Sequence, residues 1–513
     1  MGPRNGSSRL TVAPRLVACA VLLFGAGCAE ELGDIDRTQA NYLAKRDLAG
    51  AWYYLQTVVG VPPTSAFTFM GETSVTEKIR WRIQEKYLVG YRAYPKVPGA
   101  ERPSTLPADF YGEEYTENPI VAYRIESHFD RMREYNATTG EETNVLVEND
   151  TDRPWFEREY VRVDWSENLV TNFDFITVDY LDLEEGSALV KNLEYFVPEE
   201  QGGEDALHTE RDDAGQLTYL DYVGKMFVQP DEWGCYFTWM GWSAEDCTAG
   251  EIKVRHSFAR APEEPDYEPF QYDDNLMSKF GYFRSERVTY DEQRGQTDSG
   301  RRYMINRHNI WRATYRRDAA TGEYLRDPQG RRIPIPLQER QTRTVPYYLS
   351  QDFPGDPLLV RDAFETMAQW DLAARQGVAA VQGKHVAEVG TIFTLCHNPV
   401  AAADDAACGQ PGKVVRFGDL RYSVLHWVDA DQLEGPLGYG PAATDPVTGE
   451  ILSGKAHLCG AALTTYSAYV VDGIRFLNDD LPTDDLIEGT HFRQEVLDRL
   501  TGTLDPEQLH PAL

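Results

Sequence analysis

Apolar and aromatic residues recur along most of the chain in short runs with partial alternation, which is typical of β-strands. Four such runs are AWYYLQTVVG (51–60), TEKIRWRIQEKYLVGYRAY (76–94), FEREYVRVDWSENL (156–169) and RYMINRHNIWRATY (302–315). Turn-forming residues separate the runs, among them Thr139-Gly140, Gly202-Gly203, Asp213-Ala214-Gly215 and Thr321-Gly322. Residues 47–345 are therefore predicted to form a β-rich N-terminal domain of antiparallel hairpins.

Near residue 350 the apolar pattern changes to a helical period. In GDPLLVRDAFETMAQWDLAAR (355–375), Asp356 is a candidate N-cap and Pro357 would take the first helical position. The periodic apolar positions are Leu359, Val360, Ala363, Phe364, Met367 and Trp370. A strand pair is expected in KVVRFGDLRYSVLHWV (413–428), and a second amphipathic helix in TDDLIEGTHFRQEVLDRLTG (483–502). A helix followed by strands and a closing helix predicts an α+β fold rather than an all-β one.

Between these segments lies GPAATDPVTGEILSGKAHLCGA (440–461), which is typical of turn, strand, turn and strand. The polar turn DPVTG would lead directly into an apolar strand at residues 450–458. On pattern alone, this strand is one half of a plain hairpin with no ligand.

Composition and charge narrow the class of protein. The chain has 513 residues, of which 42% are hydrophobic and 12% aromatic, so it can bury a large core. Its 82 acidic residues outnumber 50 basic ones, and the formal net charge is −32. Nucleic acid is excluded as a partner on this ground, because phosphate binding needs a basic face.

The N-terminus has the pattern of a secretory signal. Arg4, Arg9 and Arg15 precede an apolar run at residues 16–24, which is too short to span a bilayer. The run ends in Gly-Ala-Gly-Cys at Cys28 and resembles the lipobox of bacterial lipoproteins. The resemblance implies cleavage before Cys28 and lipidation of its thiol, with residues 29–46 as a tether. The protein would then be anchored in the cell envelope, at the outer membrane; an ordinary cleaved signal peptide is the alternative.

The cysteines beyond the signal segment suggest local cross-links, because export implies an oxidising compartment. Cys235 and Cys247 are separated by eleven residues, and so are Cys396 and Cys408. We expect two loop-closing disulfides and a buried free thiol at Cys459. A metal site using Cys396, His397 and Cys408 is the competing interpretation, although the spacing does not fit a CxxC zinc site.

Four segments together resemble a group of large exported bacterial zinc-dependent metalloproteases of the metzincin type. They are residues 129–168, residues 280–311, VRDAFETMAQWDLAAR (360–375), and GDLRYSVLHWV with GPAATDPVTGEILSGKAHL (418–428 and 440–458). The third resembles the backing helix that opens a metzincin catalytic domain, and the fourth resembles the strands before the active-site helix. The resemblance implies that residues 346–513 form a metzincin-like mixed α/β half-domain.

The resemblance also implies where a substrate would bind. In metzincins a peptide pairs with an exposed antiparallel edge strand by main-chain hydrogen bonds. Here that strand would be residues 450–458, with candidate substrate contacts at Glu450, Ile451, Leu452, Lys455 and His457. The N-terminal domain would cover or support the cleft, as prodomains do in related enzymes.

The catalytic motif of that group, HExxHxxGxxH, does not occur in this sequence. None of the ten histidines is followed by glutamate, and no two are spaced i, i+4. No catalytic or zinc-binding residue is therefore assigned, and zinc is expected only with the missing catalytic part. A zinc site built from the distant residues His397, His426 and His457 is an alternative. The simpler expectation is that His426 and His457 are strand histidines hydrogen-bonded to backbone carbonyls.

Three functional hypotheses follow from these patterns. The first is a surface lipoprotein that comprises the N-terminal and substrate-edge part of a metalloprotease-like protein and is inactive by itself. The second is a non-catalytic envelope lipoprotein that binds peptide or protein with the same scaffold. The third is a purely structural envelope lipoprotein.

Overall fold

In the computed structural model, the described residues are 33–62, 68–100, 118–166, 168–170, 190–196, 205–228, 250–429 and 436–489. They form two compact units, of which the first comprises residues 33–38 and 131–149 and the second all the others. The predicted lipidation residue Cys28 and the predicted Cys235–Cys247 disulfide lie outside the described residues.

The smaller unit is a ribbon of strands with ion pairs on its surface. Strand β1 (Ile35–Asp36) runs parallel to β7 (Glu142–Asn149), which follows the outer end of β6 (Pro119–Tyr135) through the predicted turn at Gly140. Arg131 donates a hydrogen bond of 2.6 Å to Asp36. Exposed pairs of this kind contribute about 0–1 kcal/mol each, so they add little stability to the ribbon.

The larger unit begins with an antiparallel sheet in the order β6-β5-β4-β3-β12-β11-β10, to which β8, β2 and β9 are added at the sides. The strands are β2 (Tyr42–Ala44), β3 (Ala51–Gly60), β4 (Glu77–Ile83), β5 (Tyr87–Arg92), β8 (Tyr160–Asp164), β9 (Val190–Phe196), β10 (His208–Arg211), β11 (Leu217–Val228) and β12 (Gly250–Arg260). A 3₁₀ turn, η1 (Lys45–Leu48), precedes β3. The predicted run 51–60 is β3, and the run 76–94 contains the β4–β5 hairpin.

Aromatic side chains fill the core of this sheet. The largest fully buried or nearly buried ones are Trp52, Trp81, Trp165, Tyr123, Tyr222 and Phe258. The ring centroids of Tyr123 and Trp165 are 4.7 Å apart, and the Tyr123 and Tyr222 hydroxyls lie 2.7 Å apart in a buried hydrogen bond. The aromatic richness of the strand runs therefore reflects a packed core, because each buried ring contributes a large apolar area.

A second hairpin and a loop region connect the two sheets of the larger unit. Helix α2 (Asp274–Phe280) follows the acidic proline-bearing segment and is capped by Asp273. It leads into the hairpin β13 (Arg284–Asp291) and β14 (Gly295–Ile305). Turns and the 3₁₀ segment η5 (Leu337–Glu339) follow, including the predicted turn at Gly322.

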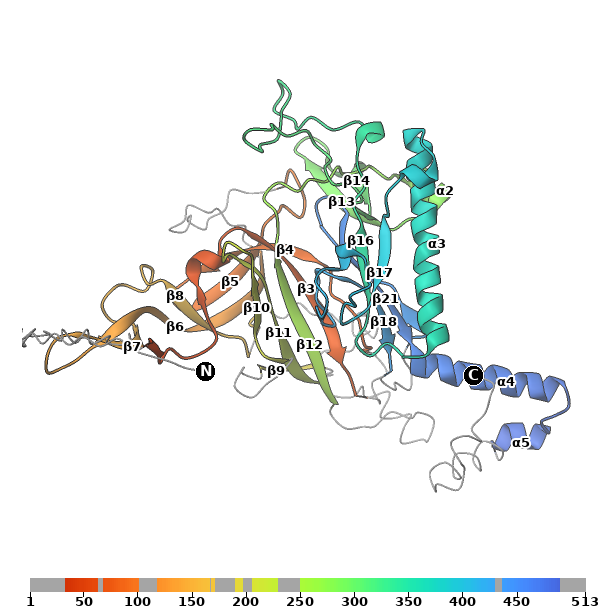
Figure 1. Ribbon diagram of the computed structural model, residues 1–513, viewed down its shortest axis with the longest axis horizontal. Coiled ribbons are helices and arrows are strands. Elements are labelled where there is room, and N and C mark those ends of the chain that lie inside the picture. Colours follow the sequence, from red (N-terminus) through yellow and green to blue (C-terminus); the bar gives the residue numbers. More distant parts are fainter. Residues whose placement is uncertain are drawn as a thin grey trace, which may run out of the picture. The chain divides into compact units, whose positions relative to one another are not determined.

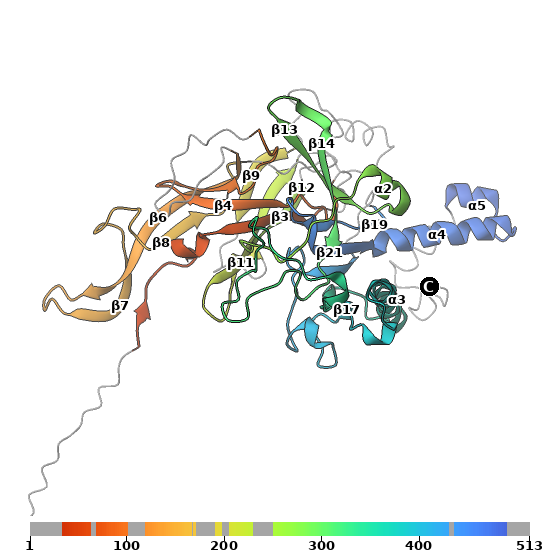
Figure 2. The ribbon, with the colours of Figure 1, turned by 90° about the horizontal axis from the view of Figure 1, so that it is seen from above.

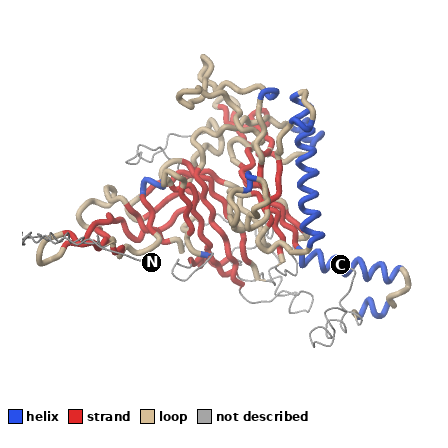
Figure 3. Tube along the Cα trace, viewed as in Figure 1, coloured by secondary structure: helices blue, strands red, loops and turns tan. Residues whose placement is uncertain are grey.

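The C-terminal part contains a mixed sheet with helices beside it (Figure 1). Its order is β15-β21-β18-β16-β17, all parallel, and the antiparallel strands β19 and β20 lie on the other side of β21. The strands are β15 (Arg307–His308), β16 (Val345–Leu349), β17 (Phe393–Cys396), β18 (Ser423–Val428), β19 (Gly438–Tyr439), β20 (Ala442–Thr444) and β21 (Glu450–Cys459). The 3₁₀ segments here are η6 (Val386–Glu388) and η7 (Ala406–Cys408). Strands with a few long helices confirm the predicted α+β class (Figure 3).

Helix α3 (Pro357–Gln382) joins β16 to β17 and begins as predicted. The side chain of Asp356 accepts hydrogen bonds from the amides of Leu358 and Leu359, and Pro357 occupies the first turn. The helix packs through its C-terminal half, where Val378 and Ala379 are buried. Four of the six expected apolar positions are partly buried, namely Val360, Ala363, Phe364 and Met367. The other two, Leu359 and Trp370, are exposed, Trp370 at 67%.

Helix α4 (Gly460–Leu477) continues directly from β21, and sequence analysis assigned no helix to it. Helix α5 (Thr483–Glu488) is a short part of the predicted helix 483–502, whose remainder lies outside the described residues. The strand pair expected at 413–428 is a single strand, β18. In the described part of the chain, no helix is both long and apolar enough to cross a membrane.

The two sheets of the larger unit pack against each other through β3 and β12 on one side and β21 with its neighbours on the other (Figures 1 and 2). Tyr53 and Leu55 of β3 form an apolar cluster with Leu420 and Ala443. The Ser257 hydroxyl accepts a hydrogen bond of 3.1 Å from the amide of Leu420. This contact places the N-terminal sheet against β21 and its neighbours, where the sequence predicted the substrate strand.

Candidate functional site: the covered edge of the C-terminal sheet

The DPVTG turn before β21 is fixed by a buried aspartate. Asp445 is completely buried, and its carboxylate accepts hydrogen bonds from the amides of Val447 (2.7 Å) and Thr448 (2.9 Å). The hydroxyl of Tyr53 donates to the same carboxylate at 2.6 Å. Burial and this carboxylate both raise the pKa of the Tyr53 hydroxyl, so it remains a donor. The turn therefore joins the start of β21 to the N-terminal sheet.

Strand β21 is not an exposed edge, so that prediction is wrong. On one side it pairs with β15 and then β18, both parallel to it. On the other side it pairs with the antiparallel strands β20 and β19. Its main-chain groups are therefore occupied on both sides, and a peptide could not add there by strand pairing. The five predicted substrate contacts all lie on this paired strand: Glu450, Ile451, Leu452, Lys455 and His457.

The antiparallel edge of the sheet is formed by β19 and β20 instead. The segment Phe69–Thr76, which we call the cover segment, lies against this edge. The Thr76 hydroxyl accepts a hydrogen bond of 3.2 Å from the amide of Thr444, and Phe69 contacts the ring of Tyr439 edge-on at 5.0 Å. The cover segment thus occupies the position at which an extended peptide would pair with this sheet.

The cover segment is itself attached to β3 by main-chain hydrogen bonds. The amide of Val58 donates to the carbonyl of Glu72 at 2.8 Å, and the amide of Gly71 donates to Val58 at 3.0 Å. Thr57 and Thr73 form an antiparallel bridge. These few bonds make the cover segment a local structure that could open without unfolding the N-terminal sheet.

Two buried histidines lie beneath the cover segment. His426 of β18 and His457 of β21 are in register, and their ring centroids are 5.4 Å apart. Among the described residues, neither ring nitrogen of His457 has a hydrogen-bond partner, nor does Nδ1 of His426. The expectation that backbone carbonyls satisfy these side chains is therefore wrong for those atoms. Burial lowers the pKa of His426 to about 3 and that of His457 to about 2.

Lys455 adds a buried cation beside the histidines. Its ammonium lies 3.4 Å from the hydroxyl of Thr57, and burial lowers its pKa to about 8. Like charge from Lys455 lowers the pKa of both histidines further. At the other end of β21, burial raises the pKa of Glu450. Lys455 and His457 thus face the N-terminal part, where they meet Thr57 and Gly71.

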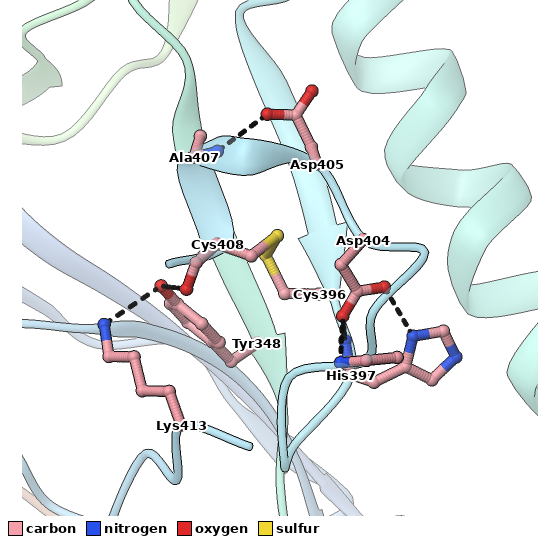
Figure 4. The surroundings of a disulfide bond; sticks show 9 residues. Tyr348, Cys396, His397, Asp404, Asp405, Ala407, Cys408 and Lys413 are labelled. Carbon is pink, nitrogen blue, oxygen red and sulfur yellow. Dashed lines mark hydrogen bonds and ion pairs between the residues drawn. A yellow bond between two sulfur atoms is a disulfide. The ribbon is translucent and has the colours of Figure 1, made fainter. Parts of the chain in front are cut away.

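The predicted Cys396–Cys408 disulfide is present (Figure 4), with a Cα–Cα distance of 5.8 Å. The Tyr348 hydroxyl donates to the carbonyl of Cys408 at 2.9 Å, beneath the closed loop. Both sulfurs are in the bond, so the competing metal interpretation is excluded for them. Closing a loop of this length contributes about 3 kcal/mol in the chain-entropy model. Cys459 is buried with a free thiol, as expected.

The structure does not bring together the three histidines of the distant zinc alternative. His397 lies beside the disulfide, where its Nδ1 is 2.7 Å from a carboxylate oxygen of Asp404 (Figure 4). His426 and His457 form their own buried pair. Within the described ranges, no three histidine, cysteine, aspartate or glutamate side chains are grouped so that they could bind a metal ion.

A separate hollow of about 460 Å³ lies on the N-terminal sheet. His128 and Trp155 line it together with acidic and basic side chains of residues 85–87 and 124–126. Nε2 of His128 is 3.0 Å from the carbonyl of Glu85, and burial lowers the pKa of His128 to about 4. None of its lining residues belongs to β19, β20 or β21, so it is distinct from the covered edge.

The signals for this site were mostly absent from the sequence pattern. Residues 440–458 marked the correct region, but the cover segment has no motif and lies more than 360 residues earlier in the chain. Comparison with models of protein families finds no match, and no characterised protein and no solved structure is detectably similar to the chain.

Proposed function

We propose that this chain is an envelope lipoprotein that comprises the N-terminal and substrate-edge part of a metzincin-like protease, inactive by itself. The observation that carries the proposal is the covered edge: the segment Phe69–Thr76 lies on the antiparallel strands β19 and β20. An N-terminal segment in this position would exclude an extended peptide, as a prodomain does.

The order of elements in the C-terminal part supports the proposal. The long helix α3 lies between β16 and β17 in the chain, and the parallel strands continue to β21, which leads directly into α4. This order agrees with the resemblance, in which a backing helix opens the domain and strands precede an active-site helix.

The uncovered faces of the long helices give independent support. Helix α4 has seven exposed large apolar side chains: Tyr466, Tyr469, Val470, Val471, Ile474, Phe476 and Leu477. An apolar helix face of this extent normally packs against other protein. We propose that the catalytic half of the domain covers it, whether that half is a continuation of this chain or a separate one.

A non-catalytic peptide-binding lipoprotein is the second candidate. The observation that favours it is the absence of HExxH from the sequence, together with an antiparallel edge that would accept a strand if the cover segment were displaced. The gene sequence downstream of the codon for Leu513 distinguishes the two. An in-frame or adjacent HExxHxxGxxH supports the protease-related function, and its absence supports the peptide-binding one.

We expect the mature chain, solubilised in detergent, to bind no stoichiometric zinc and to cleave no peptide in a mixed library, with or without added zinc. Zinc-dependent hydrolysis needs three fixed protein ligands, an open position for water and a nearby base. Elemental analysis and the library assay measure both properties. About one zinc per chain with chelator-sensitive cleavage would show that the chain is a complete enzyme.

The proposed anchor makes a separate prediction. Cys28→Ala should release the protein from membranes or block its processing, because Cys28 is the only acceptor that the lipobox-like sequence provides. Cys19→Ala, in the same segment, is the matched control and should leave the anchor intact. Mass spectrometry of the N-terminal peptide checks the result, and an unmodified N-terminus beyond Cys28 would contradict the proposal.

A further inference from the structure

The cover segment rests directly on an imidazole ring. A Cβ atom added to Gly71 would lie 2.5 Å from two ring atoms of His457, so the main chain at Gly71 touches the ring. The ring of His457 also stacks with the ring of Tyr439, and the two centroids are 6.1 Å apart. His426 lies behind it and is packed by Phe417 at 3.8 Å. The cover segment thus closes over His457, and His426 is enclosed behind it by His457 and Phe417.

The charged groups around the pair do not stabilise a protonated ring. Lys455 of β21 is a buried cation that opposes protonation of both histidines. The negative charge of Asp419 raises the pKa of Lys455, whereas the like charge of Arg255 of β12 lowers it. Glu72 of the cover segment is buried, and its negative charge raises the pKa of the Tyr439 hydroxyl. Asp221 is paired with Arg255 and Arg416.

We infer that His426 and His457 form an acid-sensitive latch, which keeps the cover segment closed over β19 and β20 while both rings are neutral and releases it when they are protonated. Opening gives the rings access to water, which hydrates a charged imidazolium far better than this apolar enclosure does. That the released edge then accepts a peptide rests on the proposed function; the opening itself does not.

The direction and size of the effect follow from proton linkage. The pKa of each histidine is lowered in the closed state, to about 3 for His426 and about 2 for His457. For the open state we use the value of a hydrated imidazole, about 6.5, for both rings. The closed state therefore has its full stability above pH 6.5 and loses it as the pH falls. Between pH 7.5 and 5.5, each histidine favours opening about tenfold, and the pair about a hundredfold. Lys455, with a pKa of about 8, is already mostly protonated at pH 7.5 and adds little to this change.

Hydrogen exchange of the full mature chain tests the latch. The reporters are the amides of Val58, Gly71 and Ser74, which are bonded within or to the cover segment. After correction for the intrinsic exchange rate, their protection should fall about a hundredfold between pH 7.5 and 5.5. The amides of Ile392 and Phe393, bound to Asp371 beside α3, should show no such fall.

Two substitutions, made singly and together, assign the effect to the rings. His426→Phe or His457→Phe keeps a planar ring but cannot take a proton, so each should retain about a tenfold fall and the double variant should lose it. His208→Gln removes a half-exposed histidine beside Glu210 and should leave the full fall. The amides beside α3 report whether each variant is folded.

The outcomes separate the latch from the proposed function. Unchanged protection at pH 5.5 in the wild type, or a full fall in the double variant, overturns the latch. If the cover segment opens at pH 5.5, a labelled extended peptide library reports on the edge. Capture at pH 5.5 but not at pH 7.5 supports both inferences, whereas opening without capture leaves the latch in place and contradicts peptide binding at this edge.

Discussion

Replacing Asp221 by alanine is expected to lower the free energy of unfolding by about 3–5 kcal/mol. Asp221 of β11 is completely buried, and one of its carboxylate oxygens receives Arg255 at 2.6 Å and Arg416 at 3.0 Å. Arg255 also donates to the carbonyl of Phe417 at 2.7 Å, so the cluster fastens the N-terminal sheet to the C-terminal part. Removing the carboxylate leaves the guanidinium groups of Arg255 and Arg416 without this counter-charge, and that of Arg255 is buried.

Denaturant unfolding of Asp221→Ala measures this loss, and an exposed pair provides the matched control. Arg326 and Glu264 are also 2.6 Å apart, but their side chains are 45% and 49% exposed. Glu264→Ala should therefore cost only about 0–1 kcal/mol. Equal effects of the two substitutions would show that burial does not determine the strength of the Asp221 cluster.

The elements that sequence analysis located correctly are those specified by local chemistry. The aromatic and β-branched run 51–60 is β3, and Asp356 with Pro357 fixes the start of α3 through side-chain capping and a preset backbone angle. Helix α4 was missed because Thr464, Thr465 and Val470 are weak helix formers. Its structure depends on its position after β21, which local propensity does not reveal.

The candidate site was less predictable because it depends on strand order. The DPVTG turn was recognisable, since Asp445 and Gly449 are characteristic turn residues. Whether β21 is an edge depends on whether β19 and β20 fold back along it. The apolar periodicity of a sequence does not predict which strands pair in this way. The same applies to the register that brings His426 beside His457. Trp370 also follows the helical apolar period, yet it is exposed.

Replacing Gly71 by alanine is expected to destabilise the closed cover segment by about 2–6 kcal/mol. Gly71 has a φ of 90°, which costs a residue with a Cβ atom about 1–3 kcal/mol. The new methyl group would also lie 2.5 Å from the His457 ring, and overpacking of this kind costs about 1–3 kcal/mol more. Because the segment is held by few hydrogen bonds, we expect it to lift from the sheet while the rest of the fold persists.

Exchange of the Val58 amide, which is bonded to the carbonyl of Glu72, measures this opening. Protection at pH 7.5 should fall at least about thirtyfold in Gly71→Ala, since each tenfold corresponds to about 1.4 kcal/mol. Gly215 provides the control: its φ is 78°, yet a Cβ atom there would meet nothing within 4 Å. Gly215→Ala carries a similar backbone cost without the clash and should leave Val58 protected. If the Val58 amide were equally protected in both variants, the clash with His457 would have no measurable effect on the cover segment. Contact between Gly71 and His457 would then not be what positions that segment.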